Sequence, residues 1–248
     1  MLGLLHDSML LDSLHDNSML PLVQVRAHIN TEDWTITVTD IVPGDLGLNV
    51  VQTRDVVDLA GRARVLARLL QAVHQATPQP VGDPDLDCGE RLSERHKVLA
   101  QRIHLPPEVA KSNVALIDPL LRRGVGLVHG DFGFHNTIWT KAETAGDPLR
   151  IDALLDWEWS GWGNPLTDPA WLWWTLQFRS APSETWASFV ETYGGWALRG
   201  IGWTADNVLT VLRAHMAWIL SCTEPGSPAE KEWGNRIIKL ELLKVPDL

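Results

Sequence analysis

The pattern of apolar and polar positions changes several times along the chain. Trp34, Ile36 and Val38 alternate with polar residues, which predicts a strand over residues 34–42 that ends at a Pro-Gly-Asp turn. From 57 to 75 the apolar residues instead recur every three or four positions, which predicts an amphipathic helix. Short apolar runs predict further strands at 22–25, 125–128, 136–140 and 151–155. Helical spacing predicts helices near 90–102, 107–121, 169–178, 183–193, 205–221 and 228–243.

The predicted helices between residues 57 and 121 separate two groups of predicted strands, and from residue 169 onward the chain is predicted to be helical. The first twenty residues contain an imperfect repeat, LHDSML at 5–10 and LHDNSML at 14–20. Two copies are too few for a solenoid, so we interpret this segment as a short helical stretch. Pro, Asp and Gly are frequent over 77–90, which predicts a surface loop. Asp168 is suited to cap the helix expected at 169–178, because its side chain can accept unpaired N–H groups.

Composition and charge restrict the classes of partner. The chain has 248 residues, 45% of them hydrophobic and 21% charged, and a net charge of −10. Nucleic-acid backbones are bound by basic surfaces, so this balance disfavours a nucleic-acid partner. It is compatible with a cationic small-molecule substrate, although the solubility that net charge confers is the simpler explanation.

Membrane and redox signals point to a cytoplasmic protein. The longest stretch without Asp, Glu, Lys or Arg is Leu69–Gly82, fourteen residues that include polar side chains. A membrane-spanning helix needs about twenty apolar residues, so none is expected. No basic residue precedes Arg26, which disfavours a signal peptide. Cys88 and Cys222 lie far apart and match neither a disulfide framework nor a zinc site.

The clearest chemical signal lies between two of the short predicted strands. His129, Asp131 and Asn136 form the pattern His-x-Asp-x4-Asn, and Asp156 follows at the end of the next strand. In phosphoryl transfer, one carboxylate orients a substrate hydroxyl and accepts its proton. An amide oxygen and a second carboxylate can hold Mg²⁺ against the phosphate oxygens of the nucleotide. Asp131 fits the first role, and Asn136 and Asp156 fit the second.

These residues resemble the motifs of the aminoglycoside phosphotransferase and choline kinase-like families, which are small-molecule relatives of the protein kinases. His129-Gly130-Asp131 through Asn136 is similar to the catalytic loop HGDxxxxN. Asp156-Trp157-Glu158, Gly163-Asn164-Pro165 and Asp168-Pro169-Ala170 resemble the metal loop and the motifs that follow it. Residues 34–44 look like the last N-lobe strand and hinge, and residues 62–74 look like the first large C-lobe helix. The resemblance extends over roughly residues 20–245.

The resemblance implies a protein-kinase-like α+β fold, with a mainly helical C-terminal lobe and a truncated, β-containing N-terminal lobe. Residues 1–45 would be the remnant of the nucleotide-binding lobe with its hinge, and 46–248 the catalytic and substrate lobe. The implied activity is that of an enzyme that moves the γ-phosphate of ATP, with Mg²⁺, to an alcohol group of a small molecule. The implied site has Asp131 as base, Asn136 and Asp156 as metal ligands, Ile41 and Val42 at the adenine, and His129, Glu158 and Asp168 in support.

Two parts of such a kinase are missing from the chain as written. A Gly-rich loop covers the phosphates, and a Lys on a nearby strand pairs with an acid from the next helix. The first lysine here is Lys97, beyond the expected hinge, and the glycines before it are Gly3, Gly44, Gly47, Gly61, Gly82 and Gly89. Asp7 is a candidate for the helix acid. Either translation begins upstream of Met1 or the lobe has been lost, and the sequence leaves both explanations open.

Two other functions are compatible with parts of this pattern. Because the phosphate-clamping parts are missing, the fold could serve as a non-catalytic binding or regulatory module. The combination of His129, Asp131 and Asn136 also suggests a metallophosphatase. Such enzymes need further clusters of His and Asp ligands, for example a Gly-Asn-His step, whereas Asn164 is followed by Pro165. Asp131-Phe132-Gly133 spells the metal motif of protein kinases, but no Asp with an Asn five residues later lies at the required distance upstream.

Several of these residues also have simple structural explanations. We expect His129 to fix the loop by hydrogen bonding, and His135 to be an exposed loop residue. Glu158 could equally support the site or have no role in it. Asn164 stands where the family has an Asp, and we expect this change to be structural and tolerated. Nine of the 13 tryptophans lie between Trp157 and Trp203. They could bind a cation through their rings, but core packing is the simpler expectation.

Overall fold

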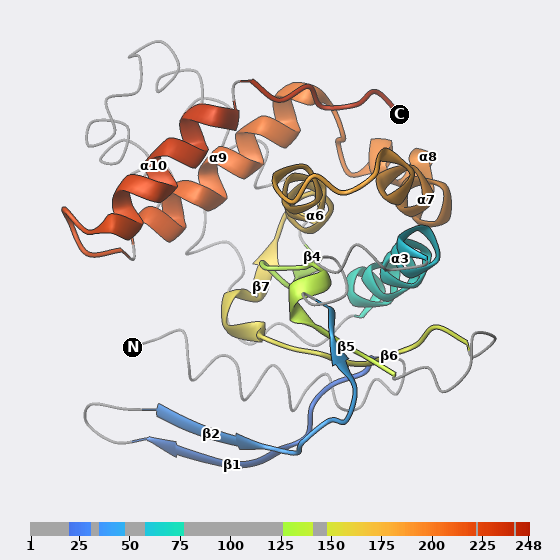
Figure 1. The fold of residues 1–248 in the computed structure, drawn as a ribbon, viewed down its shortest axis with the longest axis vertical. Coiled ribbons are helices and arrows are strands. Elements are labelled where there is room, and N and C mark those ends of the chain that lie inside the picture. Colours follow the sequence, from blue (N-terminus) through green and yellow to red (C-terminus); the bar gives the residue numbers. More distant parts are fainter. Residues whose placement is uncertain are drawn as a thin grey trace. The chain divides into compact units, whose positions relative to one another are not determined.

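The computed structural model of the chain describes residues 20–30, 35–47, 58–76, 126–140, 148–221, 223–240 and 242–248 (Figure 1). It divides into two compact units. The first comprises 1–81, 127–161 and 171–194, and the second comprises 82–126, 162–170 and 195–248. The lobe boundary predicted after residue 45 remains a prediction. The helices expected at 90–102 and 107–121, the helical stretch at 1–20 and the loop at 77–90 lie outside the described residues.

The first unit begins with an antiparallel hairpin of β1 (Val25–Asn30) and β2 (Thr35–Thr39). The first strand was expected at 22–25, whereas β1 begins at Val25 and continues to Asn30. The second was expected at 34–42, and β2 is shorter. Apolar side chains alternate along both strands and pair across them, with Ile29 opposite Ile36 and Ala27 opposite Val38. Strand β1 is tied to the chain after β2 by Arg26, whose guanidinium donates two hydrogen bonds, of 2.6 and 2.7 Å, to the Asp40 carboxylate.

A three-stranded antiparallel sheet supports the middle of the chain. Its order is β3 (Asp45–Leu46), β5 (Thr137–Trp139) and β6 (Ile151–Leu154). The sequence did not predict β3, because two residues carry no alternation. Gly44 precedes β3 with a φ of 147°, and a Cβ there would overlap the Trp139 carbonyl, so this close approach requires glycine.

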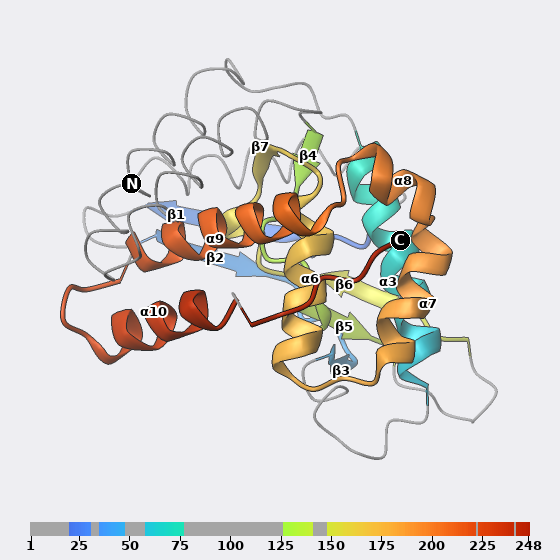
Figure 2. The same cartoon turned by 90° about the horizontal axis from the view of Figure 1, so that it is seen from above.

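Two helices of the first unit pack along one another, α3 (Leu59–Gln75) and α7 (Ser183–Tyr193), as Figures 1 and 2 show. The Asp58 side chain caps α3 by accepting the Gly61 N–H at 2.6 Å. Across the pair, Gln71 Nε2 donates to the Tyr193 carbonyl at 3.1 Å. The helix predicted over 57–75 is confirmed, and α7 has the predicted bounds.

Helix α6 (Thr167–Phe178) contributes residues to both units. Its apolar residues occur on all sides, and Trp171, Trp173 and Trp174 are buried, as expected for core tryptophans. The helix begins two residues earlier than predicted, so Asp168 lies in the first turn instead of at the cap. Upstream, Asn164 Oδ1 accepts the Leu166 N–H at 2.9 Å, a turn that an asparagine forms as readily as an aspartate.

In the second unit, α8 (Gly195–Gly200) is followed by α9 (Ala205–Ser221) and α10 (Pro228–Leu240), and the last two lie side by side (Figures 1 and 2). Helix α9 has the predicted bounds. The C-terminal segment is held by hydrogen bonds from Trp203 Nε1 to the Pro246 carbonyl at 3.1 Å and from Arg199 to Leu248 at 2.7 Å. Within the described ranges, no helix is long and apolar enough to cross a membrane.

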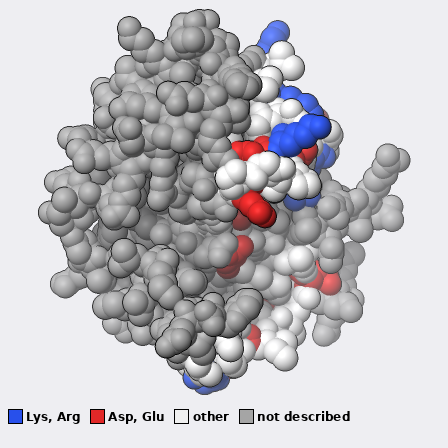
Figure 3. Space-filling model, turned by 90° about the vertical axis from the view of Figure 1, so that its left-hand side faces the viewer, with Lys and Arg blue, Asp and Glu red and all other residues white. Residues whose placement is uncertain are grey.

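Charged side chains of both signs lie interspersed where Figure 3 shows described surface. On α10, for example, Arg236 donates to Glu232 at 2.9 Å and its guanidinium lies 4.4 Å from the centre of the Trp233 ring. Four further elements of the described residues are short. They are β4 (Gly126–Val128), β7 (Gly161–Gly163) and the 3-10 turns η1 (Phe134–Asn136) and η2 (Trp157–Trp159).

Candidate active site

The loop from His129 to Asn136 connects β4 to β5 and turns sharply at Gly130. This glycine has a φ of 85°, and a Cβ at this position would overlap the Trp159 carbonyl. Only glycine combines that backbone conformation with such a close approach. The loop therefore turns directly against the segment that follows β6.

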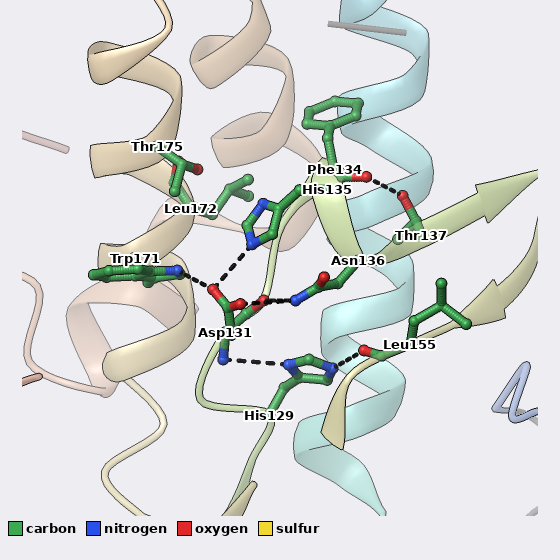
Figure 4. Close-up of polar contacts among 10 residues, drawn as sticks. All are labelled: His129, Asp131, Phe134, His135, Asn136, Thr137, Leu155, Trp171, Leu172 and Thr175. Atoms are coloured by element: carbon green, nitrogen blue, oxygen red, sulfur yellow. Dashed lines mark hydrogen bonds and ion pairs between the residues drawn. The ribbon is translucent and has the colours of Figure 1, made fainter. Parts of the chain in front are cut away.

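His129 links this loop to the end of β6. Its side chain has no exposed surface, and both ring nitrogens have partners in the chain. Nε2 donates to the Leu155 carbonyl at 2.8 Å, and Nδ1 accepts the Asp131 N–H at 3.3 Å (Figure 4). These two bonds fix the tautomer and connect the backbone before Asp156 to the backbone of Asp131.

The Asp131 carboxylate receives three side-chain hydrogen bonds. His135 Nε2 lies 2.9 Å from Oδ1, Trp171 Nε1 donates to Oδ1 at 2.5 Å, and Asn136 Nδ2 donates to Oδ2 at 2.9 Å (Figure 4). Burial alone would raise the pKa of Asp131. The hydrogen bonds and the charge of His135 outweigh burial, so the pKa of Asp131 is lowered. The carboxylate is therefore held ionised and in one orientation.

The two polar atoms of the Asn136 amide, Nδ2 and Oδ1, have different surroundings. Nδ2 donates both to the Asp131 carbonyl and to its carboxylate, each at 2.9 Å, which leaves Oδ1 as the available acceptor of the amide. The backbone carbonyl of Asn136 accepts the Leu155 N–H at 2.8 Å, continuing the pairing of β5 with β6. Strand register therefore brings Asn136 next to the residue before Asp156.

Asp156 follows β6 in a left-handed conformation, with a φ of 62°, and is exposed. A non-glycine residue in this region is uncommon and costs about 1–2 kcal/mol. The chain then enters η2, where Trp157 Nε1 donates back to the Leu154 carbonyl at 3.0 Å. The strained residue is thus held between a strand and a turn that are both anchored.

The donor chemistry of Asn136 and Asp156 fits a magnesium ion. Mg²⁺ prefers oxygen ligands and is commonly bound by one or two protein carboxylates together with substrate phosphates. One amide oxygen and one exposed carboxylate on adjoining strand ends supply that kind of partial set. The described residues contain no group of three or more His, Cys, Asp or Glu side chains that could hold a metal by itself.

The other predicted site residues lie apart from this loop in the chain. Ile41 and Val42 occupy the coil between β2 and β3, where Ile41 is 94% exposed. Asp168 is fully buried in the first turn of α6. Glu158 belongs to η2, one residue after Trp157.

The structure adds two residues to the site that the sequence did not assign to it. The expectation that His135 is an exposed loop residue is wrong, because its side chain is 20% exposed and contacts Asp131. Its position four residues after Asp131, in a tight loop, was the available signal. Trp171 was expected only to pack in the core, and it also donates to Asp131 from forty positions away. No local pattern encodes that contact.

Known proteins share sequence and fold with this chain. The model of the phosphotransferase enzyme family matches residues 9–209. A viomycin phosphotransferase from Streptomyces vinaceus is 30% identical over 104 residues, which are 42% of this chain and 32% of the relative. The matched region thus spans about a third of that relative.

Solved structures show the same fold. An aminoglycoside-3'-phosphotransferase of type VIII has a TM-score of 0.63 at 18% identity, covering 88% of this chain and 80% of the other. A thermostable mutant of APH(4)-Ia, in ternary complex with AMP-PNP and hygromycin B, has a TM-score of 0.59 at 15% identity, covering 93% and 81%. The kinase-like α+β fold predicted from the sequence is confirmed.

Proposed function

The chain belongs to the phosphotransferase enzyme family, and we propose that it transfers the γ-phosphoryl group of ATP to a hydroxyl of a small molecule. The observation that carries the proposal is the Asp131 carboxylate, which accepts hydrogen bonds from three side chains, one of them Asn136. Asn136 in turn pairs through its backbone with Leu155, the residue before Asp156. An oriented carboxylate and two nearby side-chain oxygens that can bind Mg²⁺ are among the groups that phosphoryl transfer requires of the protein.

In this proposal Asp131 orients the acceptor hydroxyl and accepts its proton as the new bond to phosphorus forms. A lowered pKa suits this role, because the carboxylate then stays ionised throughout the neutral range. It also means that Asp131 is a weak base. Its contribution is therefore mostly the orientation of the hydroxyl, as expected where little proton transfer precedes phosphorus–oxygen bond formation.

Asn136 Oδ1 and the Asp156 carboxylate are the proposed magnesium ligands. A bound Mg²⁺ supplies positive charge that stabilises the phosphate oxygens during transfer. Asn136 would contribute to both halves of the site, since its Nδ2 donates to Asp131 and its Oδ1 could bind the ion. Asp156 is exposed, so a partly hydrated ion could reach its carboxylate.

The remaining roles are supporting ones. His129 holds the loop against Leu155, and Asp168 braces the start of α6 from a buried position. Backbone groups near Ile41 and Val42 are proposed to meet the adenine, and Glu158 to support Asp156. The alternative of a non-catalytic binding module is not favoured, because the family match covers the catalytic loop and the metal loop together.

The ligands of related proteins support a proposal for the acceptor class. Their names specify viomycin, and their structures contain hygromycin B, gentamicin and streptomycin. We propose that this chain acts on a hydroxylated small molecule of that general kind. A cationic acceptor accords with the net charge of −10.

The test is transfer of labelled phosphate from Mg-ATP to a panel of these four antibiotics, choline, homoserine and simple sugars. Asp131→Ala should lower transfer by roughly 10²–10⁴-fold, the usual contribution of a positioned acid or base. Asp152→Ala is the matched control, because this carboxylate on β6 binds Arg150 at 2.7 Å and lies outside the site. Full transfer by Asp131→Ala would refute the assignment.

A further inference from the structure

The two oxygens of the Asp131 carboxylate differ in how many donors they face. Oδ1 accepts from both His135 Nε2 and Trp171 Nε1, at 2.9 and 2.5 Å. Oδ2 accepts from Asn136 Nδ2 alone among the described residues. An ionised carboxylate offers about four acceptor positions, two on each oxygen. Within the described part of the chain, Oδ1 is thus saturated, and a single acceptor position remains, on Oδ2.

The donors to Oδ1 come from two separate elements and are held there by their own packing. The Trp171 side chain is 4% exposed, and its ring lies 4.7 Å from that of Trp174, which fixes the direction of the indole N–H. His135 belongs to η1, which is anchored by a hydrogen bond from Thr137 Oγ1 to the Phe134 carbonyl at 2.8 Å. A carboxylate held from two sides cannot rotate without breaking at least one of these bonds (Figure 4).

We propose that Trp171 and His135 are positioning residues that hold Oδ1 of Asp131 and present Oδ2 to the acceptor hydroxyl. This inference rests on the proposed function. In the reaction the hydroxyl oxygen bonds to the γ-phosphorus of ATP, and the bond from that phosphorus to the bridging oxygen breaks, releasing ADP. The hydroxyl proton passes to Oδ2. The acceptor must therefore approach from the side of the carboxylate that faces away from both Trp171 and His135.

The first experiment compares two tryptophans of the same helix. Trp171→Phe removes the donor and keeps an aromatic ring, while Trp173→Phe makes the same change at a side chain that is 2% exposed and does not donate to Asp131. For transfer from Mg-ATP to the best acceptor of the panel, Trp171→Phe should lower kcat roughly 10–100-fold and leave both KM values within about twofold. Trp173→Phe should change neither. Equal losses in the two variants, at equal thermal stability, would overturn the proposal.

The second experiment asks whether His135 acts through its N–H. His135→Leu removes the donor, whereas His135→Gln keeps an N–H of similar reach. We expect His135→Leu to lower kcat about tenfold, and His135→Gln to recover most of that loss. Because both donors serve one oxygen, the double variant Trp171→Phe/His135→Leu should be non-additive. Identical behaviour of the Leu and Gln variants would show that His135 is only a space-filling residue.

A third measurement needs no turnover and separates this inference from the proposed function. In a ¹⁵N-labelled sample, the indole N–H signal of Trp171 is the one that disappears in Trp171→Phe. It should exchange slowly with solvent and shift in Asp131→Ala, while the signal of Trp173 does not shift. An unshifted Trp171 signal would refute the contact whatever the activity. A shifted signal together with full transfer by Asp131→Ala would instead refute the proposed function and leave the contact in place.

Discussion

The loop from His129 to Asn136 and the β1–β2 hairpin, both in the first unit, show opposite relations between polarity and burial. The loop carries polar side chains that are buried, with His129 fully enclosed and Asn136 only 7% exposed. The hairpin carries the apolar side chains Ile29, Ile36 and Val38, which are between 46% and 50% exposed. In the loop the His129 and Asn136 side chains both make hydrogen bonds, which offset part of the cost of removing them from water.

The comparison indicates where the structure is most sensitive to change. A buried network loses both its hydrogen bonds and its packing when one member is removed, so single substitutions there have large effects. The hairpin buries little apolar surface in its described contacts, so its side chains contribute little to stability. Substitutions in the two regions should therefore differ in size by several-fold.

The largest effect is expected for His129→Ala. The substitution leaves the Leu155 carbonyl and the Asp131 N–H without their partner and opens a cavity beside Trp157, whose ring lies 4.7 Å from that of His129. The free energy of unfolding should fall by about 2–4 kcal/mol, measured by urea denaturation. His129→Asn, which keeps a donor and an acceptor, should lose less. Equal losses would show that packing alone is responsible.

Gly130→Ala should come next, because it combines a positive φ with an overlap against the Trp159 carbonyl. We expect a loss of about 1–3 kcal/mol in the free energy of unfolding. Gly200→Ala is the matched control, since nothing lies within 4 Å of a Cβ at that position. It should be neutral within about 0.5 kcal/mol. A neutral Gly130→Ala would mean that the loop is less constrained than its contacts indicate.

Asp156→Gly should separate function from stability. Glycine adopts the φ of 62° without strain, so the free energy of unfolding should stay the same or rise by up to about 1 kcal/mol. Phosphate transfer should nevertheless be lost with the proposed metal ligand. Ser180→Gly, at a φ of 53°, should give the same stability change with transfer retained. Thermal melts and the transfer assay on the same preparations provide the measurement.

The smallest effects are expected in the hairpin. Ile36→Thr should change the free energy of unfolding by no more than about 0.5 kcal/mol, as usual for exposed positions. Any larger loss would show that this apolar face is covered in solution.

The ion pair of the hairpin gives a prediction about pH. The hydrogen bonds from Arg26 lower the pKa of Asp40 below its ordinary value of 3.8. The pair therefore stabilises the fold above that value and ceases to do so as the pH falls through the lowered pKa. Arg26→Ala should raise the pKa of Asp40, as measured by NMR titration, while the melting temperature at pH 7 falls only slightly because both groups are exposed.

The sequence predicted most of the described helices because their apolar periodicity is long and regular. Helices α7 and α9 have the predicted bounds, whereas α10 ends three residues before the predicted end at 243. Strand β3 escaped prediction because two residues show no alternation. Its pairing with β5 depends on the close approach at Gly44, which is a tertiary contact.

The site was predictable to the extent that its residues are close in sequence. The spacing of His129, Asp131 and Asn136 identified the loop, and the strand pairing that brings Asp156 near it followed from two short apolar runs. Trp171 could not be found in this way, because its contact with Asp131 depends on how α6 packs. His135 was misjudged because a polar loop residue is usually exposed, and here the three-residue turn η1 directs it back toward Asp131.

The hydrogen bonds that the Asn136 amide donates to Asp131 have a consequence for the chemical ageing of the protein. Deamidation would replace its Nδ2 donor by a carboxylate oxygen, 2.9 Å from the Asp131 carboxylate. The two negative charges would repel each other, and Oδ2 of Asp131 would lose its hydrogen-bond donor. Since the backbone pairing with Leu155 does not involve the amide, such a molecule would keep its fold. Old preparations would thus contain folded but inactive protein, one mass unit heavier and one charge more acidic.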